Sequence, residues 1–308
     1  MPHLITRCCN VKWFYLDTNV VRHTLEGVSG LNAPCLLRAR NRMRMPQIVA
    51  MELVGHLYTC HRDKFGSRRA ELNLAYNLAR DRRLLPAPGA FLARRVFKTE
   101  FSNPFLSPKQ VLRWMRTAIA HRSKDELGKF VRLGGIGSHE CALDFKMVAD
   151  GLKELREQHI EMIDRYRQDL LLKTFGPTVT VTRETQFSDA DAGMISCLFR
   201  SEEWKRMFVK NTAGTVGASV SDDDGMALYR HLEPAGEFLA TVLSQALTQG
   251  YKYWEKGNDA ADYNLLLYLC DPSLVFVTDD GALKGKLRSE AARVRVISSE
   301  ELARVLRT

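Results

Sequence analysis

Two apolar runs near opposite ends of the chain constrain the fold most, because each has the composition of a strand buried on both faces. The first, "WFYL" at residues 13–16, is aromatic and aliphatic, and the second, "LVFVT" at residues 274–278, is rich in β-branched residues. Unbroken apolar runs of this length are typical of parallel sheets that helices cover on both sides. The sequence therefore predicts a parallel sheet with strands from both ends of the chain.

Helical segments separate these strands and are delimited by capping residues and by breaks at Gly or Pro. Two further short strands are predicted at residues 43–45 and 294–297. Helices are predicted at residues 18–26, 34–42, 259–270, 281–292 and 298–306, with one more after residue 45. Strands that alternate with helices in this way indicate an α/β fold with a central parallel sheet.

The middle of the chain differs from both ends, because its segments have mostly helical periodicity. We therefore predict a discontinuous α/β domain, formed by residues 11–62 and 258–308, and a mostly helical insertion at residues 63–257.

The charge of the chain favours a polyanionic partner. The 308 residues carry a net charge of +9, and three basic runs concentrate it in the N-terminal third. Phosphates attract such surfaces, although a solvated helix face explains any single run equally well. The predicted nucleic-acid contacts are Arg38, Arg40, Arg42, Arg44, Arg82, Arg83, Arg94 and Arg95. Candidates for stacking on bases, with core packing as the alternative for each, are Trp114, Trp204, Tyr251 and Trp254.

Cysteine usage and hydropathy bear on the compartment. The seven cysteines include no CxxC pair, which argues against a disulfide framework and favours a reducing compartment. No apolar run approaches the ~18 residues of a membrane-spanning helix, and no secretory signal is visible. We expect a cytoplasmic protein without a membrane span. A soft-metal site at His56, Cys60 and His61 is an alternative that lacks a second cluster of ligands.

Acidic residues occur where the predicted sheet exposes its strand ends. Ligands of open parallel sheets bind at the carboxyl ends of the strands, and carboxylates gathered there repel one another unless a hard cation such as Mg²⁺ or Mn²⁺ neutralises them. Structural roles without a metal are the alternative for these acids: an N-cap, an exposed helical glutamate, favourable charges at a helix N-terminus, and a turn. The main candidates are Asp17, Glu52, Asp262 and Asp280, with Asn19, Asp259 and Asp279 as secondary candidates.

The acidic segments together resemble a known family. "YLDTNVV", "MPQIVAMEL", "DYNLLLYL" and "VFVTDDGAL" are similar, in this order, to the four acidic motifs of PIN domains, the PilT N-terminal-like ribonucleases. The resemblance implies a three-layer α/β/α fold with an acidic Mg²⁺ or Mn²⁺ site that cleaves RNA. It covers about half the chain. Glu52 and Asp262 are 262 − 52 = 210 residues apart, so the helical insertion departs from compact members of the family.

The resemblance also implies roles for single residues. Asp17 matches the first acid of the family, Glu52 the acid of the helix, and Asn19 a polar position that supports the metal. Asp262 matches the third acid better than Asp259 does, because it lies 278 − 262 = 16 residues before Thr278. Asp280 matches the final acid, which leaves Asp279 as the variable residue. These matches assign the metal ligands and catalytic acids to Asp17, Glu52, Asp262 and Asp280.

Three functions are compatible with this pattern. The first is a metal-dependent endoribonuclease that hydrolyses RNA with metal-activated water, with single-stranded DNA as a second candidate substrate. Partners implied by the resemblance are an antitoxin or regulatory protein, as in toxin–antitoxin pairs, and a second copy in a homodimer. The second function is a catalytically silent nucleic-acid-binding or protein-binding scaffold. The third is a phosphatase of another α/β class, which would need an acid where Asn19 stands.

Overall fold

A parallel sheet joins the two ends of the chain, as the apolar runs predict. The structure is a computed structural model that describes residues 13–28, 30–101, 107–132, 145–176, 182–183, 185–187, 189–256 and 258–307. Within these residues, five strands pair in the order β3-β2-β1-β4-β5, and all pairs are parallel. They are β1 (Trp13–Leu16), β2 (Met43–Pro46), β3 (Leu84–Leu85), β4 (Leu274–Val277) and β5 (Val296–Ile297). The predicted α/β class with a parallel sheet is confirmed.

The remaining elements are helical. The helices before residue 133 are α2 (Thr18–Glu26), α3 (Ala33–Arg38), η1 (Arg40–Arg42), α4 (Gln47–Thr59), η2 (Arg62–Lys64), α5 (Phe65–Ala79), α6 (Pro88–Leu92), η3 (Ala93–Phe97), α7 (Pro108–Ala120) and α8 (Lys124–Arg132). Those after residue 144 are α9 (Phe145–Phe175), α10 (Asp189–Leu198), α11 (Glu202–Thr215), α12 (Asp222–Thr248), α13 (Asn258–Leu266), η4 (Leu267–Cys270), α14 (Gly281–Lys286), α15 (Glu290–Arg293) and α16 (Ser299–Arg307).

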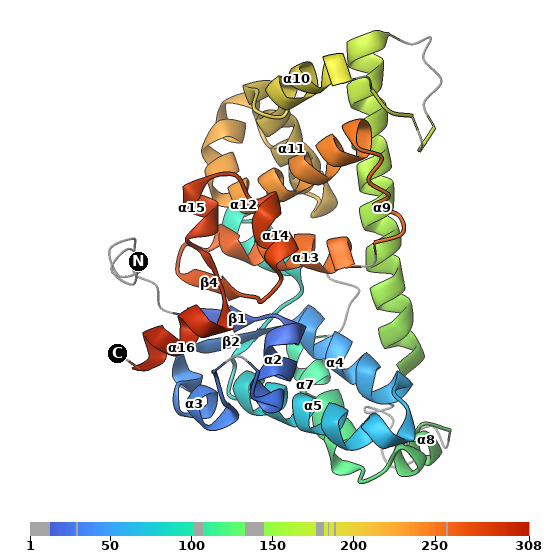
Figure 1. Cartoon of the computed structure of the whole chain (residues 1–308), viewed down its shortest axis with the longest axis vertical. Helices are drawn as coiled ribbons and strands as arrows, with labels where there is room; N and C mark the ends of the chain where they lie inside the picture. Colours follow the sequence, from blue (N-terminus) through green and yellow to red (C-terminus); the bar gives the residue numbers. More distant parts are fainter. Residues whose placement is uncertain are drawn as a thin grey trace.

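Helices cover both sides of the sheet. In Figure 1, α2, α4 and α5 lie on one side of β1 and β2, and α12, α13 and α14 lie on the other, an arrangement compatible with three layers. The long helix α9 runs along both groups and packs against α4, α12 and α13. No helix in the described part of the chain combines the length and apolar character that crossing a bilayer requires.

The buried strands explain why the sheet forms where the sequence predicts it. Phe14, Tyr15 and Leu16 are fully buried, and all four residues of β4 are buried against the same core. The ring of Tyr15 stacks on Phe276 at 4.9 Å between centroids, across the pair of strands that joins the chain ends. Burial of such side chains contributes about 1.5–3 kcal/mol each, so this pairing is strongly favoured.

Several element boundaries differ from the sequence-based expectation. The helix predicted at residues 281–292 is two helices, α14 and α15, because Glu237 of α12 accepts the backbone N–H groups of Arg288 and Ser289 at 2.9 and 3.0 Å. Ser289 then caps α15. The helix predicted at residues 34–42 divides into α3 and η1. Strand β3 extends the sheet with residues from within the range expected to be an insertion.

Candidate functional site

The chain order of the sheet reverses at β1, which pairs with β2 on one side and with β4 on the other. Ligands of open α/β sheets bind at such a switch point, outside the carboxyl ends of the strands. Asp17 follows β1 directly, and its backbone N–H donates to the carbonyl of Val277 at the end of β4. The first predicted acid therefore lies at the switch point.

Asp17 is a buried carboxylate at the N-cap position of α2. Its side chain is 7% exposed and forms no capping hydrogen bond with α2. Thr278 donates its hydroxyl to Oδ2 of Asp17 at 2.9 Å and fixes its orientation. Burial raises the pKa of Asp17, and the charge of Asp280 raises it further, while the hydroxyl of Thr278 and the nearby backbone N–H groups of Thr18 and Asn19 oppose the rise. Asp17 therefore occupies the N-cap position of α2 while its carboxylate is held mainly by Thr278.

Glu52 faces the same region from α4. The hydroxyl of Thr18, the residue after Asp17, donates to Oε2 of Glu52. Burial raises the pKa of Glu52 to about 7, and the charge of Asp17 contributes although the hydrogen bond from Thr18 opposes it. Glu52 is therefore coupled to Asp17 and is not a solvated helical glutamate.

Asp262 is the most strongly perturbed acid of the group. It lies on α13 with 8% exposure. Burial raises its pKa to about 8, and the charges of Asp17 and Asp280 act in the same direction. Asp262 and Asp280 also line a cavity of about 710 Å³ with Tyr251, Asp259 and Lys286. The charges of Asp17 and Asp280 thus act on Asp262, and Asp262 and Asp280 face the same cavity.

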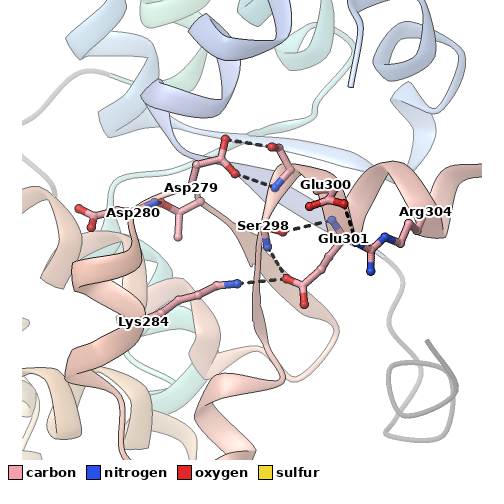
Figure 2. A network of polar contacts seen from close by, with 9 residues as sticks. Asp279, Asp280, Lys284, Ser298, Glu300, Glu301 and Arg304 are labelled. Atoms are coloured by element: carbon pink, nitrogen blue, oxygen red, sulfur yellow. Dashed lines mark hydrogen bonds and ion pairs between the residues drawn. The ribbon is translucent and has the colours of Figure 1, made fainter. Parts of the chain in front are cut away.

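The adjacent residues Asp279 and Asp280 have different roles. Figure 2 shows their side chains pointing apart. Asp280 caps α14, since its Oδ1 accepts the backbone N–H groups of Ala282 and Leu283 at 2.8 and 3.1 Å. Asp279 accepts both the backbone N–H and the hydroxyl of Ser299 at 2.9 Å. Asp279 therefore anchors the start of α16, whereas Asp280 belongs to the acidic group and also caps a helix.

Hydrogen bonds hold Asp279 in its charged form. Burial alone would raise its pKa, but the two donors of Ser299 and the ring of His23, whose Nδ1 lies 3.0 Å from Oδ2, outweigh it and lower the pKa. A capping box lies beside it: Ser298 and Glu301 exchange hydrogen bonds, and Lys284 pairs with Glu301 at 3.1 Å (Figure 2).

Loss of this anchor is expected to destabilise the protein. Asp279→Ala removes the acceptor for the two hydrogen bonds of Ser299 and the contact with His23, so the free energy of unfolding should fall by about 1–3 kcal/mol. Glu300→Ala on the same helix is a matched control, since it breaks only an exposed pair with Arg304 and should cost less than about 0.5 kcal/mol. Urea unfolding of both variants measures the difference; equal losses would contradict the anchoring role.

The secondary candidates Asp259 and Asn19 have other surroundings. Asp259 is 3% exposed and forms an ion pair with Lys286, at 2.6 Å between Nζ and Oδ1. The hydroxyl of Tyr251 donates to its other oxygen at 2.7 Å. Asp259 is therefore neutralised by a buried cation, in contrast to Asp262. Asn19 lies in the first turn of α2, and the structure shows its backbone beside Asp17.

Three of these partners are absent from the sequence-based predictions. Thr18 and Thr278 orient the acids, and their position beside a strand-end aspartate is the signal that points to them. Lys286 carries no such signal, because it lies 27 residues from Asp259 in a short helix of ordinary composition. Its role depends on the packing of α14 against α12.

The oxygen-rich donor set fits a hard divalent cation by its chemistry. Asp17, Glu52, Asp262 and Asp280 offer only carboxylate oxygens, and none forms an ion pair with another described residue. Among the described residues, however, no three His, Cys, Asp or Glu side chains converge as a metal-ligating group. The hydrogen bonds of the acids to local donors account for their separate orientations.

The predicted arginines lie mostly away from these acids. Arg42 and Arg83 precede β2 and β3 at their amino ends, the edge opposite to Asp17. Arg95 pairs with Asp271, which precedes β4 at the same edge, at 3.1 Å. Arg38 and Arg94 are exposed on α3 and η3. The arginines therefore do not surround the acidic group.

The structure also describes the candidate stacking aromatics and the suggested soft-metal site. Trp114 and Trp204 are 1% exposed and pack in the core, so they cannot stack on bases; Tyr251 and Trp254 are partly exposed. At the suggested soft-metal site, Cys60 donates its thiol to the carbonyl of Leu57, and the described residues include no metal-ligating group there.

Comparison with known proteins adds no family: no family model, curated protein or solved structure matches the chain.

Proposed function

We propose that the protein is a metal-dependent endoribonuclease of the PIN type. One observation carries the proposal: Asp17, Glu52 and Asp262 come from three separate parts of the fold, Asp17 and Asp262 are buried and Glu52 partly so, and none of them forms an ion pair with a described residue. Gathering unpaired carboxylates opposes folding unless a cation or protons compensate. A fold retains such an arrangement most readily when the carboxylates bind an ion.

The chain's own residues have defined tasks in this proposal. Asp17, Glu52, Asp262 and Asp280 would hold Mg²⁺ or Mn²⁺, which when bound activates water and stabilises charge on a phosphodiester. Thr278 and Thr18 orient two of these carboxylates. The cavity beside Asp262 and Asp280, about 710 Å³ in volume, has room for a nucleotide segment.

The paired residue Asp259 contributes to the same site indirectly. Its ion pair with Lys286 places one positive charge near Asp262, and this charge opposes the rise in the pKa of Asp262. Lys286 is therefore a positioning residue that limits repulsion in the group, and its ammonium also lines the cavity.

Calorimetric titration with Mn²⁺ tests the proposal. We expect wild-type protein to bind Mn²⁺ and Asp262→Asn to bind it at least about tenfold more weakly, because one ligand charge is lost. Asp169→Asn, which changes an exposed carboxylate on α9, is the matched control and should bind as wild type does. Absence of Mn²⁺ binding to the wild type would favour the alternative function, a catalytically silent scaffold.

That alternative rests on its own observation. Asp280 serves as a helix cap and Asp259 as half of an ion pair, so two acids of the group have structural roles that need no metal. A scaffold would bind nucleic acid or protein without Mn²⁺ and would not cleave RNA.

A further inference from the structure

Five arginines gather at the amino edge of the sheet. Because all strands are parallel, their amino ends share one edge, and the acids at the carboxyl ends occupy the other. The four residues of β1 separate the two edges by about 13 Å. The residues that we call the arginine edge are Arg40, Arg42, Arg44, Arg82 and Arg83.

Neutral groups organise the arginine edge. Asn41 links its two halves, since Arg83 donates to Oδ1 of Asn41 at 2.9 Å and Arg44 donates to its carbonyl at 3.2 Å. Arg44 also donates to the carbonyl of Met43 at 2.7 Å, and its guanidinium lies 4.4 Å from the ring centroid of Trp13. These contacts hold the guanidinium groups in place without neutralising their charge.

Carboxylates compensate this charge poorly. Asp81 forms an ion pair with Arg83 of the arginine edge, at 3.9 Å between Oδ2 and Nη1. The side chain of Asp81 is 62% exposed. Such an exposed pair contributes little. Arg40, Arg42 and Arg82 form no ion pair with any described residue. Burial lowers the pKa of Arg44, and the nearby charge of Arg83 lowers it further, which shows that the two guanidinium groups repel each other.

The turn that presents Arg82 has an unusual backbone. Asp81 and Arg82 both have positive φ, at 64° and 65°. Non-glycine residues in this left-handed region cost free energy, and such conformations cluster at ligand clamps and active sites. The turn directs two consecutive arginines, Arg82 and Arg83, to the start of β3, beside Asn41.

We propose that the arginine edge is a second RNA-binding surface, which grips the phosphate backbone apart from the carboxylate site. Its five cations are all arginines, whose planar forks match phosphate oxygens in pairs, and the partly exposed indole of Trp13 offers a flat face beside them. The arginines are spread over the starts of two neighbouring strands, so one small anion cannot contact all of them. A nucleic-acid backbone supplies several phosphates at once and can do so. The surface needs no metal and goes beyond the proposed nuclease function.

The position of the surface has a consequence for any RNA that is cut. A nucleotide held by Arg42 or Arg82 lies on the far edge of the sheet from Asp17, so the edge holds a segment distant from the bond at the carboxylates. The arginine edge therefore anchors RNA by its backbone, at a distance from the scissile phosphate.

Anisotropy of a fluorescent single-stranded RNA of mixed sequence, measured in EDTA with the full chain, tests this surface. We expect Arg42→Gln/Arg82→Gln to raise the Kd about tenfold and to reduce the slope of log K against log salt by about 1.4, or about 0.7 for each lost phosphate contact. Both side chains are exposed, but the guanidinium of Arg42 lies 5.1 Å from the ring centroid of buried Phe14, so a melting curve of the double variant is recorded to verify that it folds. Arg165→Gln/Arg230→Gln, which removes two exposed charges from α9 and α12, should leave the Kd within about twofold.

Three outcomes would overturn the proposal. Equal weakening by both double variants would show that only net charge matters, and unchanged binding by the first would remove the edge from RNA recognition. Loss of binding to a polyglutamate peptide in the first variant, with RNA binding intact, would indicate an acidic protein partner instead. Because EDTA excludes metal, failure of the nuclease proposal leaves this result unaffected.

Discussion

Replacing Asp17 by Asn is expected to lower the rate of Mn²⁺-dependent RNA cleavage at least about a hundredfold, which corresponds to about 3 kcal/mol of transition-state stabilisation. Asp17 lies at the switch point of the sheet and is coupled to Glu52, Asp262 and Asp280. Asn has nearly the same shape and can still accept the hydrogen bond of Thr278. The substitution therefore removes the charge while leaving the packing intact. Initial rates on a mixed RNA substrate measure the effect.

The melting temperature distinguishes a direct loss of cleavage activity from misfolding of the variant. Because burial disfavours the charged form of Asp17, Asp17→Asn should melt at the same temperature as metal-free wild type or above it. Asp169→Asn, on the exposed face of α9, should keep both rate and melting temperature. Wild-type cleavage by Asp17→Asn would refute the assignment of this residue. Single-stranded DNA belongs in the same assay, because nothing in the chemistry of a metal-bound phosphate distinguishes the two sugars.

In the metal-free protein, Asp262 and Glu52 together are expected to contribute on the order of 6 kcal/mol less unfolding free energy at pH 8 than at pH 5. Asp262, with its pKa near 8, and Glu52, with its pKa near 7, bind protons more tightly in the folded chain than in the unfolded chain. Their contribution is fully present below the unfolded pKa near 4 and is lost as the pH rises through the folded pKa. Stability therefore falls as the pH rises.

Urea unfolding in EDTA across this pH range measures the loss. Asp262→Asn should remove most of the dependence of the unfolding free energy on pH, since its amide has no proton to release. Asp169→Asn should show the same pH dependence as the wild type. Saturating Mn²⁺ should restore stability at pH 8 by binding the charged carboxylates. A wild-type profile that is flat in EDTA would contradict the raised pKa values of Asp262 and Glu52.

The sequence predicts the centre of the sheet and the acids around it because both depend on local patterns. The unbroken apolar runs of β1 and β4 identify buried strands, and Asp17 and Asp280 follow from the strand ends. The alternation of strands and helices predicts the α/β class. Glu52 and Asp262 lie in segments with helical periodicity, and the helices α4 and α13 that carry them start near the same edge of the sheet.

Other features depend on contacts that no local pattern reveals. β3 has only two residues, and it forms a strand because β2 offers a free edge. The break between α14 and α15 depends on Glu237, which lies about 50 residues earlier on α12. The different orientations of Asp279 and Asp280 depend on α16, and the separation of arginines from acids depends on which edge of the sheet each reaches.

The pairing of β1 with β4 sets the time at which the protein becomes complete during synthesis. Trp13 pairs with Leu274, 274 − 13 = 261 residues later, so one edge of β1 stays open while the intervening chain is made. At about 5–20 residues per second, this interval lasts roughly 13–50 s. Asp262 and Asp280 also emerge only at its end. A ribosome that stalls earlier therefore leaves a chain that carries the arginine edge but lacks two of the four acids.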